Sequence, residues 1–224
     1  MDLNVMKFFR KYQDFVIEGK KAYQYDEFSR KYRMKELREY AGVATRHVSE
    51  GGCVLEIAPG PGYFSIELAK LGNYKITGVD ISNELVKIAR VNAQQAGVGV
   101  DFLQGNTSAI PLPDRTFDFI FCLWSFKNFK EPLKVLNEMH RVLKAGATAL
   151  IIDLNHDATN FEWNRYVSNS GMKGMAALFM KIAFRIQRSG AYSKSEFSEL
   201  IQKTPFERSD IQSVGINFYA YLFK

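Results

Sequence analysis

Two acidic residues, each in or just after an apolar run, frame a glycine-containing turn in this chain. The first run carries Glu56, and the turn that follows it holds Gly60 and Gly62. The second run, residues 74–79, leads directly to Asp80. A strand, a glycine turn, a helix, a second strand and an acid form the layout of a nucleotide-type cofactor site on a parallel sheet. Glycines let the backbone approach a ligand closely, and a terminal acid can accept both hydroxyls of a ribose.

The spacing of the small residues indicates which cofactor the turn fits. Counting from Glu56, small residues recur at every second position, as Ala58, Gly60 and Gly62. A dinucleotide turn reads G-x-G-x-x-G, and a P-loop ends in Lys-Ser or Lys-Thr; this segment has neither pattern. The spacing therefore disfavours an oxidoreductase that uses a nicotinamide cofactor.

This segment resembles the first motif of class I S-adenosylmethionine-dependent methyltransferases, which is usually written acid-x-Gly-x-Gly-x-Gly. The resemblance continues in register over roughly residues 50 to 155. Its further parts are the third strand and adenine-binding turn (Asp101–Ser108), the approach to the fourth strand (Ile110–Asp118), and a helix with its following turn (Pro132–Gly146). The resemblance is closest to the small-molecule group that contains the ubiquinone and menaquinone methyltransferases.

Two positions depart from the family pattern. Ala58 replaces the first glycine, and we expect the turn to survive there if the alanine adopts a negative φ. Asn106 replaces the usual Asp, and its amide oxygen can still accept a hydrogen bond from the adenine amino group. These departures leave open a binding protein that kept the fold and lost turnover.

The resemblance implies roles for particular residues. The amides at the start of the helix near Gly62 are expected to meet the methionyl carboxylate of the cofactor. The expected cofactor-binding residues are Glu56, Ala58, Gly60, Gly62, Asp80, Ile81, Asn106, Thr107 and Leu123. The expected substrate pocket includes Tyr23, Tyr25 and Trp124.

A catalytic base is less clearly marked. Residues 123–129, after the fourth strand, contain no histidine, so the histidine that many relatives carry there has no counterpart. Asp153 and His156 follow the fifth strand on the ligand side of a parallel sheet, and either is a candidate base. Histidine titrates near neutral pH, which suits that role.

The order of elements predicts an α/β fold. Together with the resemblance, it implies a Rossmann-like sheet of seven mostly parallel strands, with the last strand antiparallel and helices on both faces. Residues 1–50 are interpreted as a helical N-terminal lid, and residues 51–224 as one methyltransferase domain with a lid-like helical insertion near 155–192. Gly215 separates the last two strands and predicts a tight hairpin.

Helix boundaries are marked by capping residues. Ser82 precedes one helical pattern and predicts its N-cap, and Gly97 predicts where that helix ends. Ser193 with Glu196 three residues later is a capping box.

Composition limits the class of protein. A chain of 224 residues that is 46% hydrophobic suits one globular domain. It has no apolar run of about 18 residues, and residues 1–5 lack the basic start of a signal peptide, so we expect a cytoplasmic protein without a membrane span. Cys53 and Cys122 lie in predicted strands as buried thiols, and the histidines and cysteines do not cluster, so no metal is expected.

The net charge of +6 lies in the flanks. Residues 51–153 hold ten basic and ten acidic side chains, whereas 1–50 hold eleven and eight and 154–224 hold nine and six. Apolar residues between Met175 and Ile186 recur at helical spacing, and Lys181, Arg185 and Arg188 fall on another face. The pattern suits either a lid helix or a helix that contacts an anionic membrane surface or a long apolar substrate.

The sequence therefore predicts an S-adenosylmethionine-dependent methyltransferase that acts on a small or lipid-like acceptor. An RNA methyltransferase is the alternative, although nucleic acid is a poor fit because the chain has no separate basic RNA-binding module. The non-catalytic relic is the other alternative. Nothing in the sequence predicts the methylated atom or the oligomeric state.

Overall fold

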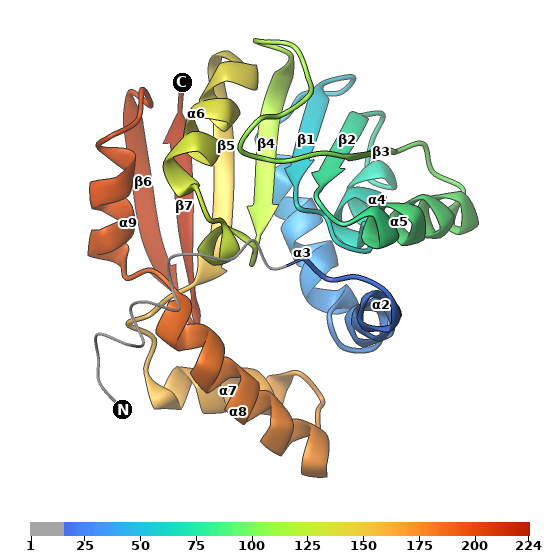
Figure 1. Ribbon diagram of the computed structural model, residues 1–224, viewed down its shortest axis with the longest axis vertical. Coiled ribbons are helices and arrows are strands. Elements are labelled where there is room, and N and C mark those ends of the chain that lie inside the picture. The colour runs from blue at the N-terminus through green and yellow to red at the C-terminus, as the bar shows by residue number, and fades with distance from the viewer. Residues whose placement is uncertain (1–15) are drawn as a thin grey trace.

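The computed structural model describes residues 16–224, which fold around a seven-stranded sheet with helices on both faces (Figure 1). The strand order is β3-β2-β1-β4-β5-β7-β6. The strands are β1 (Cys53–Ile57), β2 (Lys75–Asp80), β3 (Asp101–Gln104), β4 (Phe117–Leu123), β5 (Leu143–Leu154), β6 (Arg208–Val214) and β7 (Asn217–Phe223). β1 to β5 pair in parallel, and β7 lies antiparallel between β5 and β6. The predicted Rossmann-like sheet with an antiparallel last strand is confirmed.

The helices alternate with the parallel strands, as the sequence predicts. They are α2 (Lys20–Tyr32), α3 (Met34–Ala44), α4 (Tyr63–Ala69), α5 (Asn83–Ala96), α6 (Pro132–Val142), α7 (Asn160–Asn169), α8 (Gly174–Gly190) and α9 (Lys194–Ile201), with a 3-10 turn η1 (Phe126–Asn128). The part of the predicted N-terminal lid that precedes residue 16 lies outside the described residues. The helices α7 and α8 occupy the predicted insertion, and their role as a lid stays a prediction.

The structure confirms the predicted helix caps. Ser82 Oγ accepts a hydrogen bond from Leu85 N at 3.0 Å, and Gly97 ends α5 in the left-handed conformation at φ +68°. Ser193 and Glu196 form the reciprocal capping box that begins α9. These local signals set both ends of α5 and the start of α9.

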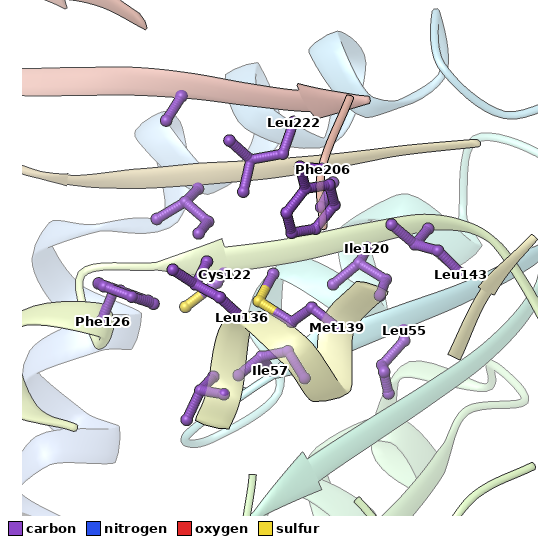
Figure 2. Packing of buried hydrophobic residues seen from close by; sticks show 14 of the residues in the cluster. Leu55, Ile57, Ile120, Cys122, Phe126, Leu136, Met139, Leu143, Phe206 and Leu222 are labelled. Atoms are coloured by element: carbon purple, nitrogen blue, oxygen red, sulfur yellow. The ribbon is translucent and has the colours of Figure 1, made fainter. Parts of the chain in front are cut away.

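The core lies on both faces of the central strands. Figure 2 shows Leu136 and Met139 of α6 beside Ile120 and Cys122 of β4, all fully buried. On the opposite face, α3, α4 and α5 pack against the alternate side chains of the same strands. Because β1 and β4 are covered on both faces, they read as continuous apolar runs. Cys53 and Cys122 are free thiols in these strands.

The last two strands form the predicted hairpin. Val214 of β6 pairs with Asn217 of β7, so Gly215 and Ile216 alone make the turn, and Gly215 has φ +56°. This tight turn leads the chain back beside β6, and β7 pairs with β5 along its other edge.

Two helical parts flank the sheet. The N-terminal helices α2 and α3 lie beside α4 and α5, and the pair α7–α8 extends beyond the ends of the strands (Figure 1). Among residues 16–224, no helix combines the length and the apolar content that crossing a bilayer requires.

Candidate cofactor and acceptor site

The glycine turn after β1 follows a path that needs small residues. Gly60 and Gly62 have φ +56° and +80°, and a Cβ added to Gly62 would lie 2.6 Å from Phe102 Cζ. The structure corrects the expectation for Ala58, whose φ is +53° rather than negative. An L-residue in the left-handed region costs about 1–2 kcal/mol, so Ala58 holds the turn under strain.

Glu56 lies beneath this turn as a buried acid. Its Oε2 accepts hydrogen bonds from Ser65 Oγ at 2.5 Å and from Ser65 N at 3.2 Å. Burial raises the pKa of Glu56 to about 7, against the opposing effect of the Ser65 bonds. The side chain therefore changes charge near neutral pH, and a cation beside it would favour the carboxylate.

Asp80 ends β2 on the other side of the turn. Its Oδ2 accepts from Gly60 N at 3.0 Å, and its Oδ1 accepts from Ser82 N at 2.9 Å. Burial raises the pKa of Asp80, and the nearby Glu18 adds to the effect. Each carboxylate oxygen keeps acceptor capacity beyond its one backbone bond, which suits the predicted ribose contact. Ile81 follows it, half-buried.

The predicted adenine contacts lie after β3. Asn106 is exposed, and its Oδ1 accepts from Ser108 N at 2.8 Å and from Ser108 Oγ at 2.9 Å. The amide oxygen that we assigned to adenine is therefore occupied by the chain itself, which leaves the Nδ2 group. Thr107 is buried beside it. The adenine role of both residues stays a prediction.

A pocket joins the sheet edge to the N-terminal helices. Its lining comprises Tyr25, Ser29, Arg33, Leu37, Glu56, Ala58, Pro59, Pro61, Tyr63, Phe64 and Leu123. The structure thus brings together four of the predicted residues, Glu56, Ala58, Leu123 and Tyr25. The other predicted residues are not part of this lining: Tyr23, Gly60, Gly62, Asp80, Ile81, Asn106, Thr107, Trp124, Asp153 and His156. Tyr23 instead donates a hydrogen bond to Glu84.

Arg33 is a pocket residue that the sequence analysis missed. Only 6% of it is exposed, and its Nη1 donates to Tyr25 Oη at 3.3 Å. Its Nε and Nη2 have no hydrogen-bond partner, although Nε lies 3.7 Å from Glu36 Oε2. Burial opposes the charge, but the neighbouring Tyr25 and Glu36 hold the pKa of Arg33 above its usual value. A buried guanidinium with free N–H groups on a pocket wall is a binding group for an anion.

Trp124 lies behind Arg33 in a strained conformation. Its φ is +54°, which is an outlier for a bulky residue, and the Arg33 guanidinium carbon lies 4.3 Å from its ring centroid. The ring also contacts Tyr166 and Phe184, with centroids 5.8 Å and 6.0 Å away. Strain of this kind is concentrated at functional sites. Trp124 therefore links Arg33 of the pocket to an aromatic cluster with Tyr166 of α7 and Phe184 of α8.

The two candidate bases lie in different surroundings. Asp153 is fully buried, and its carboxylate accepts from Lys127 N at 2.8 Å and Leu154 N at 2.7 Å, with Lys127 Nζ 3.4 Å away. His156 lies before α7, half its side chain exposed, with Nδ1 3.3 Å from Asp157 Oδ1. A base role for either residue stays a prediction. In the part of the chain that the structure describes, no three His, Cys, Asp or Glu side chains gather as a metal site.

Comparison with known proteins supports the resemblance to methyltransferases. Residues 55–151 match the family model Methyltransf_11, described as a methyltransferase domain. The chain is 33% identical over 112 residues to the ubiquinone/menaquinone biosynthesis C-methyltransferase UbiE of Marinomonas sp. (strain MWYL1), covering 48% of this chain and 45% of that protein. It is 30% identical over 145 residues to demethylmenaquinone methyltransferase of Chlorobaculum tepidum, covering 65% and 54%. The chain spans about half the length of these curated relatives.

A solved structure shows that the likeness extends over the whole fold. The crystal structure of a SAM dependent methyltransferase from Aquifex aeolicus superposes with a TM-score of 0.63 at 23% identity, covering 100% of this chain and 98% of that one. The sheet order is that of a Rossmann-like methyltransferase fold. Residues 55–151 therefore match a methyltransferase domain, and the chain resembles the class I S-adenosylmethionine-dependent methyltransferases.

Proposed function

We propose that this chain transfers a methyl group from S-adenosylmethionine to a small or lipid-like acceptor. The observation that carries the proposal is the charge pair on the pocket wall. Glu56 and the partly unpartnered Arg33 are both buried and both line the pocket beside the glycine turn. A methionyl group presents an ammonium and a carboxylate close together, and this pair of side chains complements both.

The residues present fit the cofactor part by part. Glu56 holds the ammonium, Arg33 holds the carboxylate, and Asp80 accepts the ribose hydroxyls. Arg33 takes over part of the role that we expected for the amides at the start of α4, because Ser65 N already donates to Glu56. Gly60 and Gly62 give the turn its path, since a Cβ on Gly62 would collide with Phe102 and one on Gly60 would lie 3.1 Å from Tyr25 Cε1.

When bound, S-adenosylmethionine supplies an electrophilic methyl group on a sulfonium. The chain contributes position and exclusion of water, and near-attack placement alone lowers a barrier by roughly 7–11 kcal/mol. Leu123 and Phe64 give the pocket an apolar wall at the carboxyl end of the strands. Since neither Asp153 nor His156 lines this pocket, we propose an acceptor that ionises readily and needs no strong base.

The proposed acceptor is a quinol-like or phenolic ring. The relatives are named for ubiquinone and menaquinone biosynthesis. In this chain, Trp124, Tyr166 and Phe184 form an aromatic cluster next to Arg33, which suits an aromatic ring with an apolar tail. RNA fits this cluster less well, because the core of the domain carries no net charge.

The test is calorimetry followed by turnover. We expect S-adenosylmethionine and S-adenosylhomocysteine to bind with micromolar affinity and NAD to show no binding. A transfer assay with demethylated quinols, phenols and isoprenoid-tailed acceptors then identifies the class of product. Tight binding without transfer to any acceptor would support the non-catalytic relic, and absence of binding would refute the cofactor assignment.

A further inference from the structure

Exposed large apolar side chains are concentrated on α7 and α8. Across residues 16–224 they number eleven, and six lie on these two helices: Phe161, Met175, Leu178, Phe179, Ile182 and Ile186. Met175 is 79% exposed and Phe179 is 70% exposed. We name these six side chains the apolar stripe. Such a concentration on a protein surface marks an interaction site.

The stripe and the packed side of α8 are two different faces of the helix. The opposite face of α8 carries Met180 and Phe184, which are buried against α7. The ring centroids of Phe184 and Trp163 are 4.5 Å apart. This buried face anchors α8, which lies with α7 at one end of the molecule (Figure 1).

The charge around the α8 part of the stripe has one sign. Between Glu162 and Glu196 the chain has no acidic residue, and its basic residues are Arg165, Lys173, Lys181, Arg185, Arg188 and Lys194. At 100° per residue, Lys181 and Arg185 fall along one edge of the stripe, and both are exposed. Arg188 is tied to the fold, since its Nε donates to His156 O at 2.8 Å.

We propose that α8 and the start of α7 dock on an anionic phospholipid surface. The stripe enters the boundary between headgroups and acyl chains, while Lys181 and Arg185 extend to the phosphates. A small anion would need the cations but not the exposed Phe179 and Met175. A second copy of this chain would place the same basic face against itself, with no acid between Glu162 and Glu196 to pair with it.

This surface is independent of the proposed methyl transfer, because it needs neither cofactor nor turnover. Its position nevertheless connects it to the site. Phe184, on the buried face of α8, contacts Trp124, which in turn stacks on Arg33 of the pocket. When α8 is docked on the lipid surface, only a few side chains would therefore separate the pocket from the lipid.

The proposal is tested by flotation with vesicles of phosphatidylcholine alone and of phosphatidylcholine with about one third phosphatidylglycerol. We expect binding to the anionic vesicles, little binding to the neutral ones, and a marked loss in high salt. The variant Lys181→Gln/Arg185→Gln should weaken partitioning by roughly fivefold for each charge removed. The variant Phe179→Gln/Ile182→Gln should weaken partitioning into the anionic vesicles at low salt and at high salt alike.

Matched controls change the same residue types on other surfaces. Lys75→Gln/Lys87→Gln removes two exposed lysines, and Leu71→Gln/Val91→Gln removes two exposed apolar side chains, all outside α7 and α8. Both controls should bind as the parent does. No vesicle binding by the parent, equal loss in test and control variants, or a dimer in light scattering that Phe179→Gln/Ile182→Gln dissociates would each overturn the proposal.

Discussion

Arg33 places a buried positive charge beside the glycine turn, and its Nε and Nη2 have no hydrogen-bond partner within the described chain. A donor left without an acceptor in a buried site is costly, so an anion that accepted from these nitrogens would stabilise the arrangement. The carboxylate of the proposed cofactor has the right charge and number of acceptors. The strained Trp124 keeps the guanidinium in place by stacking on it.

We predict that Arg33→Met weakens the binding of S-adenosylmethionine by roughly 10- to 100-fold, the loss expected for a hydrogen bond to a charged group. Calorimetry would measure it. Methylthioadenosine, which lacks the methionyl carboxylate and ammonium, should bind both proteins alike. Arg38→Met, which removes an exposed guanidinium on α3, is the control. Equal loss for both ligands would show that Arg33 only supports the fold.

Glu56 makes a separate prediction about pH. Burial raises its pKa to about 7, so it is largely protonated at pH 6 and largely ionised at pH 7.5. In the proposed complex the carboxylate holds the cofactor ammonium, so affinity should fall roughly eightfold between about pH 7.5 and about pH 6. In Glu56→Gln the affinity should be low and nearly independent of pH in this range. A parent profile as flat as that of the variant would remove Glu56 from the contact.

The same pKa predicts the pH dependence of stability without ligand. The folded state holds the Glu56 proton more tightly than the unfolded state, whose pKa is near the ordinary 4.5. As pH rises from about 4.5 through 7, the free energy of unfolding should therefore decrease, because the stabilisation contributed by the protonated Glu56 is lost. Urea titrations of the parent and of Glu56→Gln at several pH values would compare the slopes, and identical slopes would contradict the raised pKa.

At the scale of elements, the glycine turn is the part whose backbone is under strain. Ala58→Gly should relieve the left-handed strain and stabilise the fold by up to about 1 kcal/mol, or roughly 2–4 °C in Tm. Gly62→Ala should destabilise it by about 1–3 kcal/mol, because its Cβ would collide with Phe102. Thermal melting compares the two. A destabilised Ala58→Gly would mean that the alanine methyl contributes packing that outweighs the strain.

The residues before α2 form hydrogen bonds with the start of α5. Glu18 accepts hydrogen bonds from Asn83 N at 3.0 Å and Glu84 N at 3.3 Å, and Ser82 Oγ donates to Ile17 O at 2.6 Å. These contacts hold the segment over the start of α5, next to Asp80. The predicted lid therefore has a defined attachment point beside the proposed ribose contact.

We predict that Glu18→Gln weakens this attachment, because an amide caps the α5 N-terminus less well than a carboxylate. Association and dissociation of S-adenosylhomocysteine should both become several-fold faster, as stopped-flow fluorescence would measure. Glu27→Gln, an exposed acid on α2, is the control. Unchanged rates in Glu18→Gln would show that the segment does not limit access to the site.

At the scale of the whole molecule, the net positive charge and most exposed apolar side chains lie outside the segment that builds the sheet and the glycine turn. The neutral core of residues 51–153 builds the sheet and the turn, whereas the basic flanks supply Arg33 on one side and the α8 surface on the other. The two flanks meet in space, since Arg33 stacks on Trp124 and Trp124 contacts Phe184. The proposed acceptor region lies where the flanks meet.

Local patterns in the sequence predicted the sheet, the helix caps, the hairpin at Gly215 and the cofactor turn. Each depends on residues a few positions apart, whose periodicity, caps and conformational freedom act before any distant contact forms. Glu56 and Asp80 belong to the same class, because the ends of adjacent parallel strands necessarily meet at one edge of the sheet.

Only the tertiary structure decided the surroundings of these residues. Nothing near Arg33 in the sequence distinguishes it from the other basic residues of the N-terminal segment, and its importance comes from burial against Trp124, ninety-one positions away. The occupied amide oxygen of Asn106, the positive φ of Ala58 and the filled carboxylate of Asp153 are likewise invisible in residue types. Hydrogen-bond occupancy, burial and backbone strain are set by which distant segments pack together, and local sequence does not contain that information.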